Sequence, residues 1–193
     1  MNPAVTVGAV EDADFGPLWR MDLTYDASRV LTLVRTGAED QPHLAFTWQD
    51  RAPETALYNT YTAAGLRPAA PNVDLFLVAR TLEAACGLLI VVVPRWTDAG
   101  EITDLAVDRP SRGLGAGRAL IDGAIALAKE RSLRALWVEP RADNEAAIRF
   151  YVRLGFRISG FNDRMYSNTD AGSTAIFMYL EVPGDRSGLS AAR

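Results

Sequence analysis

A predicted strand, a glycine-rich turn and a predicted helix follow one another in the segment Leu105-Ala106-Val107-Asp108-Arg109-Pro110-Ser111-Arg112-Gly113-Leu114-Gly115-Ala116-Gly117-Arg118-Ala119-Leu120. Three glycines let the backbone approach a bulky anion, which the first N–H groups and the positive end of the helix would face. The turn is therefore a candidate phosphate site, with a tight turn that binds nothing as the alternative. It is not a Walker loop, because no Lys-Ser or Lys-Thr follows the last glycine.

The segments on either side of this turn have different periods. Upstream, alternating or β-branched runs joined by short polar turns predict an antiparallel meander over Val73–Arg80, Gly87–Val93 and Glu101–Val107. Downstream, a helical stripe predicts a helix that packs one face on the sheet through Leu120, Ile121, Ala124, Ile125 and Ala128. We then expect a strand ending at Val138, a helix over Asn144–Leu154 and a strand over Ala175–Val182. Without an early βαβ unit, a dinucleotide-binding fold is disfavoured.

The N-terminal third has weaker patterns. Val5 and Val7 predict a first strand, and a helix beginning near Glu11 is expected to carry Phe15, Leu18, Trp19, Asp22 and Leu23. Alternation around Val30–Val34 and His43–Trp48 predicts a hairpin that turns over Thr36–Asp40, followed by a connection over 51–72. His43, the single histidine, is expected in an exposed turn, which disfavours a histidine-based triad.

Length and charge restrict the remaining classes. The 193 residues suit one domain, expected over 1–182, with a flexible tail over 183–193. The net charge of −4 disfavours a nucleic-acid partner and suits a cationic small molecule. The longest apolar run, Cys86–Val93, is too short to cross a membrane, and no basic leader precedes it, so we expect a cytoplasmic protein without a membrane partner. Cys86 is expected to be a core thiol in a reducing compartment.

A second informative segment runs from Leu136 to Phe156, where a predicted strand ends in Glu139 and a helix begins with Asn144. The pattern Arg112-x-x-Gly115-x-Gly117 resembles the pyrophosphate-binding motif of the GCN5-related N-acetyltransferases. The pattern Asn144-x-x-Ala147-x-x-x-Tyr151-x-x-x-Gly155-Phe156 resembles their next motif. The similarity covers about residues 73–182. It implies an α/β fold, with a mixed, mostly antiparallel, twisted sheet flanked by helices.

Within that superfamily the chain resembles the streptothricin acetyltransferases, through Trp96 and the segments Glu101–Leu105, Leu136–Glu139 and Met165–Tyr179. Ser173 departs from this pattern, since an acidic residue is usual there. The stretch from Leu136 to Tyr151 also resembles the ribosomal-protein alanine acetyltransferases, so both branches stay open.

The resemblance implies an acetyl-CoA-dependent N-acetyltransferase that acts on a primary amine of a small cationic molecule, needs no metal and has a homodimer as one option. An acyl-CoA sensor without turnover is the rival from another class. The cofactor-binding residues implied are Leu105, Ala106, Val107, Arg112, Gly113, Leu114, Gly115, Ala116, Gly117, Arg118, Asn144, Ala147 and Tyr151.

Acyl transfer to an amine requires a base for the ammonium and a proton for the departing thiolate. Tyr151 is the candidate acid, since a tyrosine of pKa about 10 can protonate the anion of a thiol of pKa about 8.5. Core packing is the alternative for Tyr151, and helix N-capping is the alternative for Asn144.

Three carboxylates are candidate bases, and a water chain could replace any one of them: Glu139, Asp104 and Glu101. Each is also explained as a solvated carboxylate at a strand edge. Glu101 and Asp104 are further expected, with Asp22 and Asp26, to border the acceptor and attract a polycation.

Overall fold

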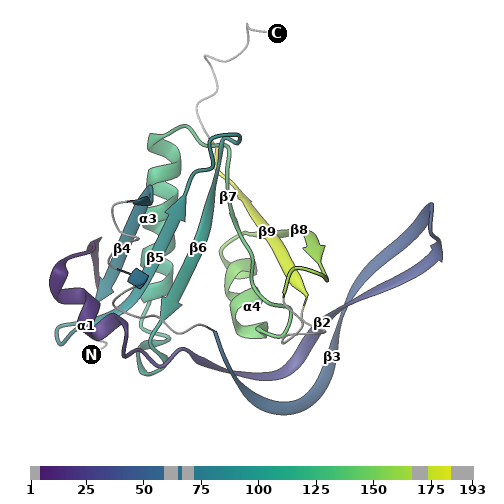
Figure 1. Ribbon diagram of the computed structural model, residues 1–193, viewed down its shortest axis with the longest axis horizontal. Helices are drawn as coiled ribbons and strands as arrows, with labels where there is room; N and C mark the ends of the chain where they lie inside the picture. Colours follow the sequence, from purple (N-terminus) through teal and green to yellow (C-terminus); the bar gives the residue numbers. More distant parts are fainter. Residues whose placement is uncertain (1–4, 59–64, 67–71, 167–173, 184–193) are drawn as a thin grey trace, which may run out of the picture. The chain divides into compact units, whose positions relative to one another are not determined.

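The computed structural model describes residues 5–58, 65–66, 72–166 and 174–183 (Figure 1). Its internal contacts divide the chain into two units. Unit 1 comprises Met1–Leu23, Asn59–Val138 and Tyr179–Arg193, and unit 2 comprises Thr24–Tyr58 and Glu139–Met178. The expectation of one domain over 1–182 stays a prediction. The expected tail over 183–193 lies, after Pro183, outside the described residues.

Unit 1 is built on a sheet in which β1, β4, β5, β6, β7 and β9 are neighbours in that order. Pairing is antiparallel from β1 to β6, and β7 runs parallel to β6. This arrangement confirms the predicted meander and the mixed, mostly antiparallel sheet. The strands are β1 (Thr6–Ala9), β4 (Leu75–Arg80), β5 (Ala85–Val92), β6 (Ala99–Val107), β7 (Ala135–Val138) and β9 (Ala175–Glu181), of which Tyr179–Glu181 belong to this unit.

The helix α3 (Ala116–Glu130) covers one face of this sheet. Four residues of its predicted apolar stripe are fully shielded from solvent and Ile125 is half-buried; the shielded residues are Leu120, Ile121, Ala124 and Ala128. Leu77 of β4 points to this face, since a Cβ added to Gly123 would lie 2.3 Å from Leu77 Cδ1. The buried stripe fixes how α3 lies on the sheet and therefore where the helix begins.

The opposite face of the sheet is covered by the short helix α1 (Phe15–Leu18), which follows the 3₁₀ turn η1 (Asp12–Asp14). Phe15 and Leu18 of α1 belong to one core cluster with residues of the sheet. The sheet residues point to the face opposite Leu77 and are Phe76 and Val78 on β4, Leu88 and Ile90 on β5, and Ala106 on β6. Helices thus flank both faces, as the sequence predicted. Cys86 in β5 is buried, which confirms the expected core thiol.

The expectation that the first helix extends to Leu23 is wrong, because α1 ends at Leu18. The backbone N–H of Asp22 donates to Asp108 Oδ1 at 2.8 Å, and its carbonyl accepts from the N–H of Arg109 at 2.9 Å. These two bonds engage backbone groups that a longer helix would use. They also tie the link after α1 to the end of β6.

Unit 2 contains a long curved hairpin formed by β2 (Thr24–Ala38) and β3 (Gln41–Leu57) (Figure 1). The predicted hairpin is confirmed, with its turn narrowed to Glu39-Asp40. Gly37 has a φ of +88°, and a Cβ there would lie 2.6 Å from the carbonyl oxygen of Gln41. Glycine is therefore required where the strands approach the turn.

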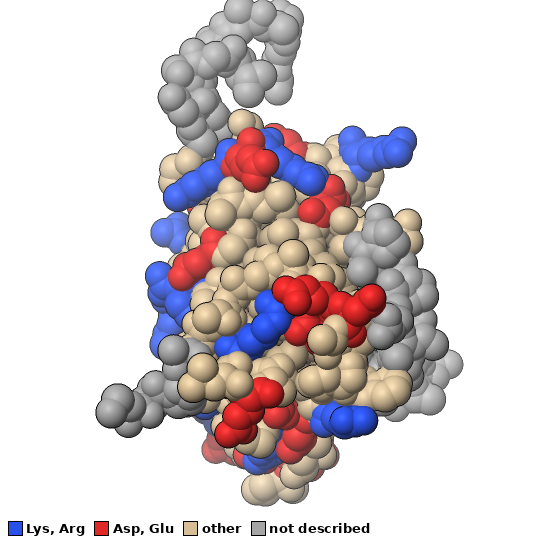
Figure 2. All heavy atoms as spheres, turned by 90° about the vertical axis from the view of Figure 1, so that its left-hand side faces the viewer, with Lys and Arg blue, Asp and Glu red and all other residues tan. Residues whose placement is uncertain are grey.

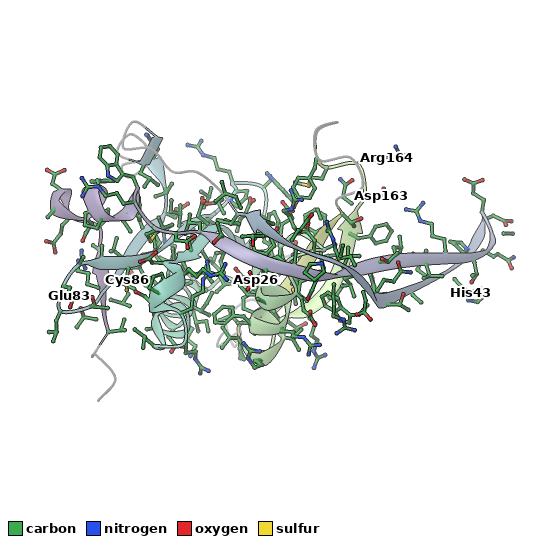
Figure 3. All side chains as sticks on the ribbon, turned by 90° about the horizontal axis from the view of Figure 1, so that it is seen from below. Asp26, His43, Glu83, Cys86, Asp163 and Arg164 are labelled. Carbon is green, nitrogen blue, oxygen red and sulfur yellow. The ribbon has the colours of Figure 1, made fainter. Side chains whose placement is uncertain are left out.

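Two expectations about this hairpin are corrected. His43 lies on β3 rather than in a turn, although it is exposed, near the far end of the hairpin (Figure 3). Residues 51–57 continue β3 instead of forming a connection. Pro53 had argued against a strand, but it lies at the register shift between the pairs Ala27–Glu54 and Arg29–Asp50. Proline is tolerated at such an irregularity, where no ladder hydrogen bond is lost.

The rest of unit 2 consists of α4 (Glu145–Arg153), β8 (Arg157–Asn162) and the first part of β9, Ala175–Met178, beside β8. α4 packs on β2. The ring of Phe46 on β3 meets that of Phe161 on β8 edge-on, with centroids 5.8 Å apart. The strand β8 escaped prediction because it is the last strand of its sheet and is largely exposed, so its residues need no apolar alternation.

Charges of both signs are interspersed over the face shown in Figure 2.

Within the described ranges, every helix is too short or too polar to cross a membrane.

Candidate active site

The glycine turn of unit 1 connects β6 to α3, as the sequence predicted. After β6 come the 3₁₀ turn η3 (Arg109–Ser111) and an extended Arg112, whose Nε donates to the carbonyl oxygen of Val107 at 3.1 Å. Gly113 and Gly115 have φ angles of +82° and +93°, and Gly115 is the N-cap of α3. A Cβ at either glycine would meet no atom within 4 Å, so backbone conformation, not crowding, requires glycine.

The first N–H groups of α3 have no acceptor within the helix. The first intrahelical bond runs from the N–H of Ala119 to the carbonyl of Gly115. The N–H groups ahead of it, on Ala116, Gly117 and Arg118, therefore lack helical acceptors. The first turn of α3 carries no acidic residue, which leaves the positive end of the helix uncompensated there. The Arg118 side chain pairs with Asp122 one turn later at 3.1 Å, and both are exposed. This arrangement suits a diphosphate.

The strand β6 loses a neighbour before it reaches the turn. Its parallel pairing with β7 ends at Ile102–Val138, whereas β6 continues beside β5 to Val107. Ala106 is buried in the core around α1, and Leu105 and Val107 are half-buried. The backbone edge of β6 beyond Ile102 is thus the part of this strand that can accept an extended, amide-bearing chain.

A bulge in β6 places Glu101 and Asp104 on the same face of the strand. The register with β5 passes from Val91–Ile102 to Ile90–Asp104, which leaves Thr103 as an extra residue. Glu101 pairs with Val92, and paired residues share a face, so both carboxylates lie on the face of Ile90. Without the bulge, their spacing of three would place them on opposite faces.

In unit 2, Asn144 begins α4 as its N-cap. Its Oδ1 accepts from the N–H of Ala147 at 3.1 Å, which confirms the structural alternative for Asn144. Tyr151 is 5% exposed, and its ring meets the rings of Phe150 and Phe156 edge-on at 5.3 and 5.2 Å. Tyr151 therefore packs in the core of unit 2, and its role as an acid stays a prediction.

Glu139 belongs to a polar cluster that the sequence did not reveal. The hydroxyl of Tyr166 donates to Glu139 Oε1. The Arg141 guanidinium lies 5.2 Å from the centroid of the Tyr166 ring and donates twice to Asp143, at 3.2 and 3.1 Å. The hydroxyl of Tyr25 on β2 also donates to Asp143, at 3.0 Å. An Arg and an Asp two residues apart after a strand were the available signal, but their partners are distant in the chain.

The pKa values of the two carboxyl groups in this cluster are shifted in opposite directions. Burial raises the pKa of Glu139, and the Tyr166 hydroxyl and the Arg141 charge offset only part of that rise. Burial also acts to raise the pKa of Asp143, but Arg141, Tyr25 and Arg51 together hold it below its usual value. Glu139 is thus the carboxylate that takes up a proton more readily.

The two remaining acidic candidates are exposed. Asp22 lies in the link after α1 in unit 1, and Asp26 lies on β2 in unit 2 (Figure 3). Neither residue is on a helix, contrary to the expectation for Asp22. Ser173, which departs from the expected acidic residue, lies outside the described residues.

Known proteins resemble this chain in sequence. Residues 38–156 match the family model described as the acetyltransferase (GNAT) family. The ribosomal protein bS18 alanine N-acetyltransferase of Escherichia coli K12 is 36% identical over 85 residues, covering 44% of this chain and 57% of that protein. Streptothricin acetyltransferase of Streptomyces lavendulae is 34% identical over 98 residues, covering 50% and 52%. The chain thus spans little more than half the length of these two relatives.

Solved structures resemble it over most of its length. A nourseothricin acetyltransferase superposes with a TM-score of 0.78 at 23% identity, covering 93% of this chain and 99% of that chain. A Bacillus anthracis protein solved in complex with acetyl coenzyme A has a TM-score of 0.76, also at 23% identity, covering 92% and 99%. These similarities show that the fold is shared.

The Asp143 cluster should govern the acid stability of unit 2. Because the pKa of Asp143 is lowered by folding, its contacts stabilise the protein above the unfolded-state pKa of about 3.9, and this stabilisation is lost as the pH falls through the folded-state pKa. We expect Asp143→Asn to cost about 3 kcal/mol at pH 7, because Arg141 loses its buried partner, and progressively less below pH 4. Thermal unfolding from pH 2 to pH 7 measures the difference.

The matched control is Asp163→Asn, which removes an exposed ion pair with Arg35 and should cost less than about 1 kcal/mol. Equal losses for the two variants would contradict the assignment.

Proposed function

The chain belongs to the acetyltransferase (GNAT) family, and we propose that it transfers an acetyl group from acetyl-CoA to a primary amine of a small cationic molecule. The observation that carries this proposal is the turn from Arg112 to Gly117. It combines two glycines at positive φ, the first N–H groups of α3, which lack acceptors within the helix, and a helix start without acids. Such a turn recognises the diphosphate of coenzyme A by its backbone.

The predicted cofactor residues divide between the two units. In unit 1, the diphosphate would lie at the turn from Arg112 to Arg118, with the amide-bearing pantetheine arm along the β6 edge formed by Leu105, Ala106 and Val107. In unit 2, Asn144, Ala147 and Tyr151 share the beginning and one stripe of α4. Capping leaves one lone pair of Asn144 Oδ1 and its amide N–H groups for a ligand.

The reaction needs three proton transfers: two from the acceptor nitrogen and one to the departing thiolate. Glu139 takes a proton from the ammonium of the acceptor, directly or through a water. The free amine then attacks the thioester carbonyl, a C–N bond forms and the C–S bond breaks. As the tetrahedral intermediate collapses, the attached nitrogen loses its second proton to water, and Tyr151 gives its hydroxyl proton to the thiolate and recovers one from solvent. Glu139 returns its proton to solvent, so that the net products are the amide, coenzyme A and one proton. The half-buried Glu139, with its raised pKa, supports the role of base, while Asp104 remains the second candidate.

The acceptor class rests on a likeness in sequence and on charge. Streptothricin acetyltransferase of Streptomyces lavendulae is among the similar proteins, and Asp22, Asp26, Glu101 and Asp104 could attract a polycation. The similarity to the bS18 alanine N-acetyltransferase favours a protein N-terminus as a second candidate acceptor. An acyl-CoA sensor that does not turn over remains the rival from another class.

A panel of amines distinguishes these acceptors. We expect thiol release from acetyl-CoA with streptothricin or a related polyamine, with an apparent KM that rises with salt and with Asp26→Asn, since exposed carboxylates are screened beyond about 10 Å. Acetyl-CoA affinity, measured by calorimetry, should not change in that variant. Turnover of an alanine-terminated peptide alone would move the protein to the second candidate, and binding without turnover of any amine would favour the sensor.

Gly115→Ala tests the diphosphate site. A φ of +93° is strained for alanine, so the backbone should leave the conformation that aligns the N–H groups. We expect acetyl-CoA affinity to fall about tenfold or more, with the melting temperature changed by only a few degrees. The matched control is Gly16→Ala in α1, where a Cβ also meets nothing within 4 Å and φ is not positive. Unchanged affinity in folded Gly115→Ala protein would place the diphosphate elsewhere.

Tyr151→Phe tests the acid. Phenylalanine keeps the packing against Phe150 and Phe156 but has no proton to give. We expect kcat to fall about 10²-fold or more, the usual contribution of general acid catalysis, while acetyl-CoA affinity holds. Near-normal turnover would show that Tyr151 serves only the core.

A further inference from the structure

Tyr166 lies far from Glu139 in the chain but contacts it in unit 2. Glu139 immediately follows β7, and Tyr166 follows β8, 27 residues later. Both side chains are half-buried, and the Tyr166 hydroxyl donates to Glu139 Oε1. This hydrogen bond restricts the orientation of the Glu139 carboxylate, because one of its two oxygens is held by the Tyr166 hydroxyl. Glu139 is the group that we propose as the base.

The cluster also fixes the orientation of the Tyr166 ring. Arg141 lies over it at 5.2 Å from the centroid, and the guanidinium is held in turn by two hydrogen bonds to Asp143. Asp143 is 5% exposed and accepts a third bond from Tyr25 on β2. Arg51 on β3 lies 3.6 Å from Asp143. The Tyr166 ring is thus held by Arg141, and Arg141 is held by Asp143, which in turn contacts β2 and β3. The orientation of the phenol is therefore fixed by side chains from several parts of unit 2.

We infer that Tyr166 is a positioning residue for the reaction: its hydroxyl holds the Glu139 carboxylate ionised and in one orientation, ready to take the proton of the acceptor ammonium. This inference rests on the proposed function, and it adds the residue that favours the ionised, proton-accepting form of a half-buried glutamate.

The electrostatics of the surroundings agree with this role. Burial raises the pKa of Glu139, while the Tyr166 hydrogen bond and the Arg141 charge lower it. The charged and titratable groups in the cluster are Tyr166, Arg141, Asp143, Tyr25 and Arg51. Asp143 offsets part of the positive charge of Arg141. The hydrogen bond from the Tyr166 hydroxyl is therefore the main interaction that favours the ionised form of Glu139. Removing it should raise the pKa of Glu139 further, so that a larger fraction of the base is protonated at any pH on the acidic limb.

The test compares Tyr166→Phe with Tyr25→Phe. Each change removes one hydroxyl from the same cluster, but only the first removes a donor to Glu139. The acidic limb of kcat/KM against pH reports the base in the free enzyme. We expect this limb to move to higher pH in Tyr166→Phe, with a several-fold loss of rate near pH 6 that recovers near pH 9. In Tyr25→Phe the melting temperature should fall, but the limb should stay.

A second measurement does not require activity. The ¹³C resonance of the Glu139 carboxyl carbon, assigned with Glu139→Gln, gives its titration directly. We expect it to titrate at higher pH in Tyr166→Phe than in wild type or Tyr25→Phe. In wild type alone, the ζ carbon of Tyr166 should sense the same titration, since its hydrogen bond weakens when Glu139 takes a proton. This comparison stands even where Tyr166→Phe folds poorly.

The outcomes separate the two proposals. A wild-type protein that acetylates no amine overturns the proposed function, while the carboxyl titration still decides whether Tyr166 controls Glu139. An unchanged titration in Tyr166→Phe, or the same change in Tyr25→Phe, overturns the inference even in a fully active enzyme. A shifted titration with an unshifted rate profile overturns it too, because Glu139 would then not be the base.

Discussion

The packing of α3 on the sheet of unit 1 is the constraint on which the candidate diphosphate site depends. The fully shielded stripe that includes Leu120 and Ile121 fixes the helix on β4, β5 and β6. Burying each such side chain contributes roughly 1.5–3 kcal/mol, so the helix cannot slide or rotate cheaply. The start of α3 therefore remains directly after the glycine turn, and its N–H groups keep one direction. The geometry of the candidate diphosphate site is therefore a consequence of apolar contacts several residues away.

The same principle applies to the carboxylates, whose properties differ because their neighbours differ. Asp143 receives two bonds from Arg141 and one from Tyr25, and its pKa lies below the usual value. Glu139, four residues earlier, accepts a hydrogen bond from the Tyr166 hydroxyl. Its pKa lies above the usual value because burial outweighs this bond. Two carboxyl groups in one cluster thus have pKa values shifted in opposite directions, the pattern that separates acid from base roles in many enzymes.

Strong local periodicity explains which parts of the fold could be predicted. The apolar stripe of α3 and the apolar runs of β4 and β5 are visible in the sequence because these elements bury one face or both. The strand β8 is an exposed edge, so nothing in its residues marks it. The early end of α1 depends on Asp108 and Arg109, some 90 residues away, and no local pattern encodes such a contact.

The candidate site likewise contains local motifs, which the sequence reveals, and long-range contacts, which it does not. The glycine turn and the N-cap Asn144 are local motifs, and the sequence located both. The shared face of Glu101 and Asp104 requires a bulge at Thr103, which the sequence did not indicate. The contact between Tyr166 and Glu139 requires the chain to return after β8.

The hairpin of β2 and β3 has a consequence for synthesis of the chain. Its strands are joined by a two-residue turn, so it can form in microseconds once residue 57 has left the ribosome. Its partners come much later, since Tyr25 and Asp143 are 118 residues apart. At roughly 5–20 residues per second, the 105 residues from Leu57 to Asn162 take about 5–21 s, and only then does the whole of β8 exist to contact Phe46. During that interval the hairpin has two open strand edges, which are templates for pairing with another chain.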